Sequence, residues 1–234
     1  MQYNRSLREA WQATVARLGG TDAGATVLLG PHAEILVDQL PGPTSGSTTG
    51  VATLGGEPIP EGAEPEATGL PNGSFDTAVA LSAWESPADI GTIVDEAIRV
   101  TKSEGTVWLG EIDARTLTVA MPAARPYGLL YRYERSAAAD VRTRFRAANG
   151  LGVEAVRSGL RSVTETRAEL PAAVARSPEE VVEAVRSGVW PGTSNLDPAA
   201  RDRLLGRVAE SFHRSTRFPL VLTLPWTLVR GRRP

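Results

Sequence analysis

The sequence predicts one α/β domain in which helices cover both faces of a mostly parallel sheet. Short apolar runs of strand length alternate along the chain with longer segments of helical periodicity. The length of 234 residues suits a single continuous hydrophobic core. Hydrophobic residues make up 41% of the chain and charged residues 22%, proportions that are typical of a globular protein.

The first predicted elements are a helix and a buried strand. Within residues 1–24, Ser6 and Glu9 have the spacing of a helix capping box, and apolar residues follow at helical intervals. The run Ala25–Gly30 is apolar and ends in glycine, which is typical of a buried strand.

Residues 31–74 have a different composition, rich in proline, glycine, serine and threonine, and show little periodicity. The pattern predicts a short helix over 33–40, a strand over 49–54 and a loop over 55–69.

Regular structure returns with a predicted strand over Phe75–Ser82. Ser86–Asp89 then supplies an N-cap, a proline at the first helical position and an acid three residues after the cap. The apolar stripe that follows predicts an amphipathic helix to Thr101, and Thr106–Ile112 reads as the next strand.

The second half of the chain is predicted to contain four helices and two strands. The helices are expected at 136–148, 152–159, 178–186 and 198–212, and the strands at 161–170 and 219–229. Pro225 interrupts the last strand and predicts an edge position or a bulge there.

Composition excludes several kinds of chemistry. The chain has no cysteine, which excludes disulfides, thiolate metal ligands and cysteine nucleophiles. Its two histidines lie far apart in sequence, and no acidic cluster has metal-ligand spacing, so we expect no metal site. Neither a phosphate-binding lysine loop nor the G-x-S-x-G motif of a serine hydrolase is present.

Charge is distributed unevenly along the chain. Residues 1–100 carry 13 acids and 4 arginines, whereas the remainder carries 14 acids and 21 bases. The arginine excess reflects genomic base composition or a basic face for a partner or an acidic ligand. Acids dilute the densest basic stretch, 132–146, so we expect no nucleic-acid binding but a possible protein partner or homo-oligomer.

We find no apolar run near the ~20 residues that a membrane helix needs. The first residues lack the basic and then apolar layout of a secretion signal. The expectation is a cytoplasmic protein without a transmembrane segment.

Several passages, taken in order, resemble class I S-adenosylmethionine-dependent methyltransferases. Gly69–Val79 is similar to the family's L-P-x-x-G-S-F-D passage, and Pro87–Leu109 to the helix and strand that follow it. Ser158–Val163 resembles the turn before strand six, and Val229–Pro234 the end of strand seven. The resemblance implies a Rossmann-like fold with seven strands.

The resemblance also implies an organisation for the chain as a single methyltransferase-like domain over residues 1–234. In that reading, 1–24 form an N-terminal helix and 25–125 form the first half of the core. Residues 126–234 then hold a helical insert with strands six and seven.

The glycine loop that holds the cofactor in this family is altered here. Family members follow the first strand with G-x-G-x-G, since small residues let the backbone approach the cofactor. Only Gly30 of that pattern remains, and Pro31, His32 and Glu34 occupy the other positions. A glutamate at this place would also repel the cofactor's carboxylate.

Two other cofactor positions of the family map onto this chain. The acid that accepts the ribose hydroxyls falls at Ala52-Thr53, where the threonine hydroxyl could make one weak hydrogen bond. Glu66 stands where the family often has an acid near the adenine, or is a surface-loop residue. If S-adenosylmethionine is bound, we expect Gly30, Thr53 and Glu66 to contact it.

Candidate chemical residues lie after the first and fourth strands. His32 is a candidate general base, because its ordinary pKa is about 6.5, or it fills space in the altered loop. Glu85 is a second candidate base, and Trp84 with Glu85 would line a substrate pocket. The alternative is that Trp84 packs over the next helix beside a solvated acid.

Three hypotheses of function remain open. The first is a methyltransferase-like protein that has lost S-adenosylmethionine binding, holds no cofactor and serves as a structural, scaffolding or regulatory subunit. The second is a divergent, active methyltransferase of a small molecule. The third is the same fold used for another reaction, with His32 or Glu85 as the base.

Overall fold

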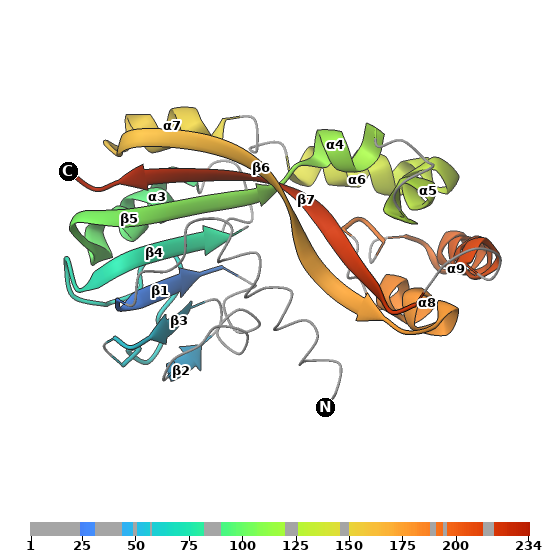
Figure 1. Ribbon diagram of the computed structural model, residues 1–234, viewed down its shortest axis with the longest axis horizontal. Coiled ribbons are helices and arrows are strands. Elements are labelled where there is room, and N and C mark those ends of the chain that lie inside the picture. Colours follow the sequence, from blue (N-terminus) through green and yellow to red (C-terminus); the bar gives the residue numbers. More distant parts are fainter. Residues whose placement is uncertain are drawn as a thin grey trace. The chain divides into compact units, whose positions relative to one another are not determined.

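The computed structural model describes residues 24–30, 44–48, 51–56, 58–81, 90–119, 126–145, 150–187, 191–193, 196–212 and 218–234. Seven strands lie within these ranges (Figure 1). They are β1 Thr26–Leu29, β2 Thr44–Thr48, β3 Val51–Leu54, β4 Phe75–Leu81, β5 Thr101–Ile112, β6 Arg161–Ala175 and β7 Leu220–Arg232. The helices are α3 Ile90–Val100, α4 Ala114–Val119, α5 Pro126–Tyr133, α6 Arg135–Arg144, α7 Leu151–Arg157, α8 Pro178–Arg186 and α9 Pro198–Phe212.

The seven strands form one open sheet in the order β2-β3-β1-β4-β5-β7-β6. The central strands β1, β4 and β5 run parallel to one another. β3 is antiparallel to both β1 and β2, and β7 is antiparallel to β5. The expected seven-stranded α/β architecture is confirmed, but its parallel part is limited to the centre, so the sheet is mixed rather than mostly parallel.

The chain divides into two compact units, which differ in their content. One unit comprises 8–112, 147–168 and 226–234, and carries the sheet with α3 and α7. The other comprises 1–7, 113–146 and 169–225, and carries the remaining helices.

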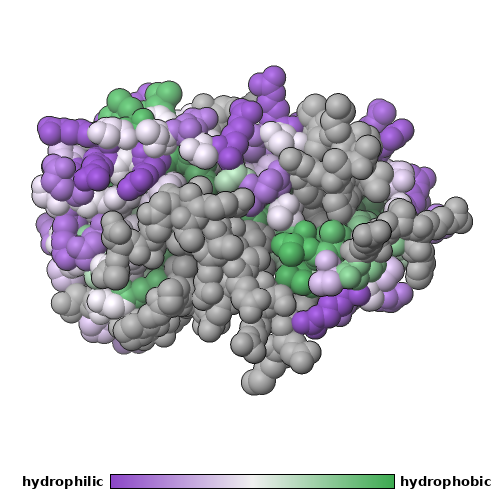
Figure 2. All heavy atoms as spheres, viewed as in Figure 1, coloured by the Kyte–Doolittle hydropathy of each residue, from purple (hydrophilic) through white to green (hydrophobic). Residues whose placement is uncertain are grey.

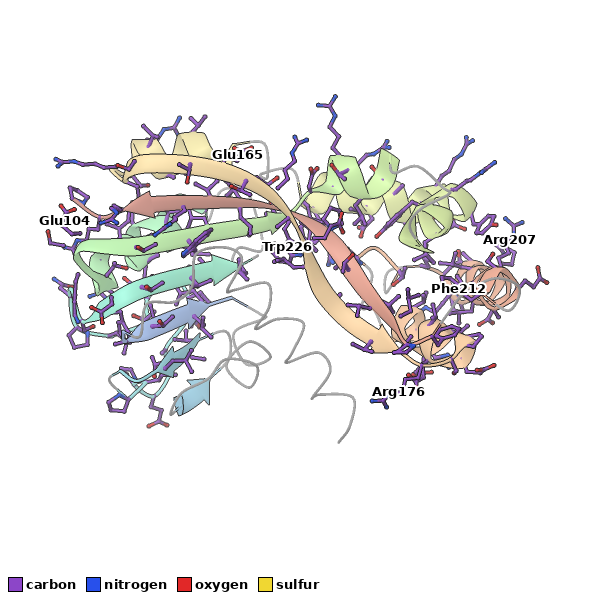
Figure 3. All side chains as sticks on the ribbon, viewed as in Figure 1. Glu104, Glu165, Arg176, Arg207, Phe212 and Trp226 are labelled. Atoms are coloured by element: carbon purple, nitrogen blue, oxygen red, sulfur yellow. The ribbon has the colours of Figure 1, made fainter. Side chains whose placement is uncertain are left out.

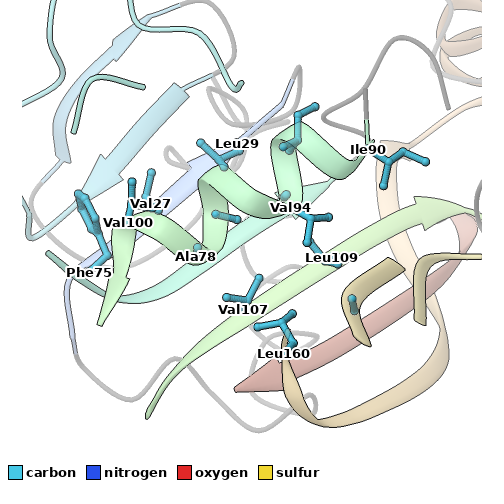
Figure 4. Close-up of a cluster of buried hydrophobic side chains, with 14 of the residues drawn as sticks. Val27, Leu29, Phe75, Ala78, Ile90, Val94, Val100, Val107, Leu109 and Leu160 are labelled. Atoms are coloured by element: carbon cyan, nitrogen blue, oxygen red, sulfur yellow. The ribbon is translucent and has the colours of Figure 1, made fainter. Parts of the chain in front are cut away.

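The core of the sheet-bearing unit lies between α3 and one face of the sheet (Figure 4). Side chains alternate between faces along a strand, so every second residue points toward the helix. Those residues are Val27 and Leu29 of β1, Ala78 and Ala80 of β4, Val107 and Leu109 of β5, and Val229 of β7. α3 contributes Ile90, Ile93, Val94, Ala97 and Val100 to the same cluster. α7 contacts α3, and its Leu151 and Ala155 complete this face.

Two contacts join α5 to other parts of the helical unit. The Tyr131 hydroxyl on α5 donates a hydrogen bond of 2.8 Å to the Pro191 carbonyl, and burial raises the pKa of this tyrosine. Arg207 on α9 lies over the ring of Tyr133, 5.2 Å from its centroid, which joins α9 to α5.

Several predicted boundaries agree with the structure because they depend on local signals. Ser177 caps α8 by accepting a hydrogen bond from the Glu180 backbone N–H, as its spacing predicts. At Pro225 the outcome is different, since β7 continues through it and lies between β5 and β6. The pairing of β7 with β5 ends at Trp226, which lies opposite Ile112. Pro225 is just outside this pairing, so its missing N–H removes no hydrogen bond between the two strands.

Other elements were not predicted or lie outside the described residues. The strand β2 and the helices α4 and α5 have no counterpart in the sequence prediction. The predicted helices within 1–24 and 33–40 fall on residues that the structure does not describe. Among the described residues of the sheet-bearing unit, no helix covers the second face of the sheet.

Candidate functional site

The candidate site is the edge of the sheet where the parallel strands end. Because β1, β4 and β5 run in one direction, their carboxyl ends meet at the same edge, where α/β proteins place ligands. Gly30 ends β1 there and is buried, with a backbone φ of 107° that favours glycine.

The neighbouring strand β3 reaches this edge with its first residue rather than its last. Val51 pairs with Leu29, and Leu54 pairs with Thr26, so β3 ends at the opposite edge of the sheet. An acid at the carboxyl end of this strand would point away from a ligand at the candidate site. β3 is also antiparallel to β2, the strand that precedes it in the chain.

Thr53 lies within the core rather than at the candidate site. It pairs with Val27, one strand position from the opposite edge, and its exposed fraction is 0%. Since directly opposite residues share a face of the sheet, Thr53 points toward the α3 side with Val27. The ribose contact that the sequence comparison implies for Thr53 stays a prediction.

Glu66, the predicted adenine contact, lies in a partly exposed loop. The loop closes on itself by two backbone hydrogen bonds between Glu64 and Ala67. Two residues after Glu66, Thr68 donates to the Glu96 carboxylate from its backbone N–H at 2.8 Å and from its hydroxyl at 2.6 Å. These bonds attach the loop to the second half of α3.

Glu96 is buried, and both oxygens of its carboxylate accept hydrogen bonds within this network. Arg99 donates to it from Nε at 2.6 Å and from Nη2 at 2.7 Å, and also donates to the Asn72 side chain. Burial opposes ionisation of Glu96, but the hydrogen bonds from Arg99 and Thr68 outweigh it and lower its pKa. Glu96 therefore has the environment of a structural ion pair that fixes the loop.

One ionisable residue that sequence reasoning did not single out lies near the candidate site. Glu111 is the second-last residue of β5 and pairs with Thr227 of β7. Its exposed fraction is 1%. By alternation from Leu109 it points toward the α3 face, close to the carboxyl edge. The signal in the sequence that could have identified Glu111 is an acid at the end of an apolar strand. A carboxylate at such a position can accept hydrogen bonds from a ligand.

The following acid, Asp113, has a structural role in the helical unit. Its carboxylate accepts hydrogen bonds from the backbone N–H of Thr116 at 2.9 Å and from that residue's hydroxyl at 2.6 Å. This arrangement caps the start of α4.

The remaining predicted site residues lie outside the described residues. They are Pro31, His32 and Glu34 of the altered loop and Trp84 and Glu85 after β4. Their roles stay predictions. Within the described ranges, no group of histidine, aspartate or glutamate side chains has an arrangement suited to a metal ion. In those same ranges, no helix has both the length and the apolar character needed to cross a membrane.

Comparison with known proteins gives matches at the level of structure alone. No family model matches the sequence, and no curated protein matches it. Similar solved structures include phosphoethanolamine N-methyltransferase 2 of Haemonchus contortus, with 10% identity and a TM-score of 0.39 over 73% of this chain and 36% of that one. The chain thus spans about a third of the length of that enzyme.

Two bacterial structures are similar in the same way. A protein assigned as a methyltransferase of an antibiotic biosynthesis pathway in Anabaena variabilis has 18% identity and a TM-score of 0.46, over 71% of this chain and 70% of that one. An S-adenosylmethionine-dependent methyltransferase of Thermotoga maritima has 15% identity and a TM-score of 0.38, over 74% and 62%. The three similar structures named here are described as methyltransferases.

Proposed function

We propose that this protein is a methyltransferase-like protein that does not hold S-adenosylmethionine in the manner of its structural neighbours. It serves as a non-catalytic structural, scaffolding or regulatory subunit. The observation that carries the proposal is the direction of β3, whose carboxyl end lies at the edge opposite the candidate site.

The sequence supports the same proposal independently. Pro31, His32 and Glu34 stand where a cofactor loop needs small residues, and Ala52-Thr53 stands where the family has the acid that holds the ribose. Both the loop that approaches the cofactor and the acid that would hold its ribose are therefore altered. A nucleoside that loses these contacts together loses most of what orients it.

Isothermal titration calorimetry with S-adenosylmethionine and S-adenosylhomocysteine tests the proposal. We expect no saturable heat for either compound at concentrations up to about 1 mM, which corresponds to a binding free energy weaker than about −4 kcal/mol. Saturable binding with a micromolar dissociation constant would overturn the proposal.

A second candidate function is a divergent methyltransferase acting on a small molecule, and Gly30 favours it. The first glycine of the loop is retained, and its positive φ provides the turn from which a rebuilt loop could still approach a cofactor. Catalysis in such a site would consist largely of positioning the methyl group against a nucleophile.

Mass spectrometry of the purified protein separates the two candidates. Retained S-adenosylmethionine or S-adenosylhomocysteine would favour the active enzyme. In that case Glu66→Gln should weaken cofactor binding, whereas Glu61→Gln, a matched change in the same loop, should leave it unaltered.

A further inference from the structure

The turn that leads into β4 contains an Asn-Gly pair, Asn72-Gly73. Asn72 is exposed, and Gly73 has a backbone φ of 61°, a conformation that favours glycine. The turn lies at the edge of the sheet where β4 and β5 begin, since Phe75 pairs with Thr101. Figure 2 shows largely hydrophilic surface at this end of the sheet-bearing unit, on the left of the view. Water therefore reaches the asparagine side chain.

An asparagine that is followed by glycine can lose its side-chain amide without an enzyme. The backbone nitrogen of the glycine attacks Cγ of the asparagine, so that a bond from this nitrogen to Cγ forms and the bond from Cγ to Nδ2 breaks. Ammonia leaves and takes the proton of the glycine N–H. The cyclic succinimide that results is opened by water to aspartate or isoaspartate. Asparagine is one of the thermolabile residues, and glycine has no side chain to obstruct the attack.

Arg99 of α3 binds both groups that this reaction brings together. Its Nη1 donates to Asn72 Oδ1, and its main-chain carbonyl accepts a hydrogen bond of 2.9 Å from the Gly73 N–H. The next backbone N–H, of Ser74, donates to the Val100 carbonyl at 2.9 Å. A backbone N–H that donates a hydrogen bond is deprotonated only after that bond opens. The attacking nitrogen and the side chain that it attacks are therefore both restrained by the end of α3.

Arg99 is itself held in place by a buried acid. Its guanidinium donates two hydrogen bonds to the Glu96 carboxylate, of 2.6 Å and 2.7 Å. Movement of this side chain away from Asn72 would leave a buried carboxylate without its cation, which costs free energy. The Arg99 carbonyl also accepts a hydrogen bond of 3.0 Å from Arg233 Nη1, which fixes the end of the helix from β7.

We propose that Asn72-Gly73 is a site of spontaneous deamidation whose rate the fold controls through Arg99. The reaction is slow while Arg99 holds both groups, and it proceeds when the turn separates from the end of α3 by local opening. Each product changes the turn. Aspartate places a second carboxylate beside Arg99, where it competes with Glu96 for the guanidinium. Isoaspartate adds one atom to the main chain between residues 72 and 73, which displaces the hydrogen bonds of the turn to α3.

The proposed modification site lies at the opposite edge of the sheet from the candidate functional site. Figure 3 labels Glu104 near the start of β5 and Trp226 at the other end of the pairing between β5 and β7. Gly73 lies at the Glu104 edge, because a Cβ added to it would be 3.9 Å from Lys102 Cα. Deamidation at this edge does not involve the residues that follow β1 or β4, so this inference is separate from the proposed function.

Peptide mapping by mass spectrometry, after incubation at mildly alkaline pH, tests the proposal. We expect Asn72 to deamidate at least about tenfold more slowly in the folded wild-type chain than in the chain unfolded by guanidinium chloride. The sequence contains a second pair of this kind, Asn149-Gly150, whose asparagine lies outside the described residues. In the unfolded chain both pairs should react at similar rates, so the second pair serves as an internal reference.

Two variants show whether Arg99 is responsible. Arg99→Met removes the guanidinium and keeps the main chain, and it should raise the rate constant at Asn72 in the folded chain by about tenfold. Arg157→Met is the matched control, because Arg157 pairs with Glu154 on α7 at the same spacing of three residues as Arg99 with Glu96. It should leave the rate constant at Asn72 unchanged.

Hydrogen exchange separates local release of the turn from loss of the whole fold. In Arg99→Met we expect exchange of the Gly73 N–H to accelerate together with deamidation. Exchange of the backbone amides of β5 should stay slow, since this strand lies between β4 and β7.

Three results would overturn the proposal. The first is an Asn72 that does not deamidate in the unfolded chain. The second is an equal rate in the folded and unfolded wild type, a comparison that needs no variant. The third is a rate in folded Arg99→Met that equals that of the folded wild type. None of these measurements uses S-adenosylmethionine, so this inference and the proposed function succeed or fail separately.

Discussion

At the scale of single residues, two glycines of the helical unit differ in their surroundings. Gly192 has a φ of 79°, and a Cβ there would lie 2.6 Å from the Ala137 carbonyl oxygen. Gly206 lies on α9 with nothing within 4 Å of an added Cβ. We expect Gly192→Ala to lower the free energy of unfolding by about 2 kcal/mol or more, and Gly206→Ala to raise it by about 0.5–1 kcal/mol. Urea unfolding measures both, and equal effects would contradict the argument.

The buried carboxylate of Glu96 gives a second prediction at this scale. The pKa of Glu96 in the folded protein lies below its ordinary value of 4.5. The ionised carboxylate therefore stabilises the fold fully above pH 4.5, and this stabilisation is lost as the pH falls through the lowered pKa. We expect Glu96→Gln to lower the free energy of unfolding by about 2 kcal/mol at pH 7 and by much less near pH 2. Asp95→Asn, on the exposed side of the same helix, is the control. Thermal unfolding over pH 2–7 checks this, and a difference independent of pH would argue against the ion-pair network.

At the scale of elements, the end of β7 stabilises the end of α3. Arg233 donates from Nη1 to the Arg99 carbonyl at 3.0 Å and also to the Thr101 carbonyl, which are acceptors at the helix C-terminus. We expect Arg233→Ala to lower the free energy of unfolding by about 1 kcal/mol, whereas Arg232→Ala, an exposed neighbour, should change it little. Chemical denaturation measures the pair, and similar losses in both variants would show that general charge, not capping, is responsible.

Elements also differ in how far the sequence predicted them. α3, α8 and α9 and the strands β1 and β4 were predicted close to their observed bounds, since periodicity and caps are local signals. β2 was missed because Thr44–Thr48 contains no apolar residue and is paired only through its hairpin with β3. β3 was predicted as a strand, but a short apolar run carries no information about its direction.

At the scale of the whole molecule, β6 and β7 each belong to both compact units. The chain passes from one unit to the other within β6 at 168–169 and within β7 at 225–226. We expect a single unfolding transition, because strands shared by both units couple their stability. Gly192→Ala in one unit and Glu96→Gln in the other should therefore lower one common midpoint, measured by calorimetry. Two resolved transitions, each shifted by only one variant, would contradict this.

The candidate site shows the same division between local and tertiary information. The sequence identified Gly30 and the altered loop after it, because a glycine pattern and its loss are visible residue by residue. It did not identify Glu111, whose burial at the end of β5 depends on β7 pairing beside it. It assigned Thr53 a cofactor contact by position in a motif; that contact stays a prediction, and only the structure shows that Thr53 pairs with Val27 and is buried.

The amino-acid sequence alone determined the α/β class of this protein, the positions of its principal helices and strands, and the loss of small residues after the first strand. These depend on neighbours within a few positions along the chain. Only the tertiary structure decided the direction of β3, the burial of Glu96 and Glu111, and the contact of Arg99 with the turn at Asn72-Gly73. Each of these depends on which distant segments pair, and a strand's own residues do not specify the partner or the direction of that pairing.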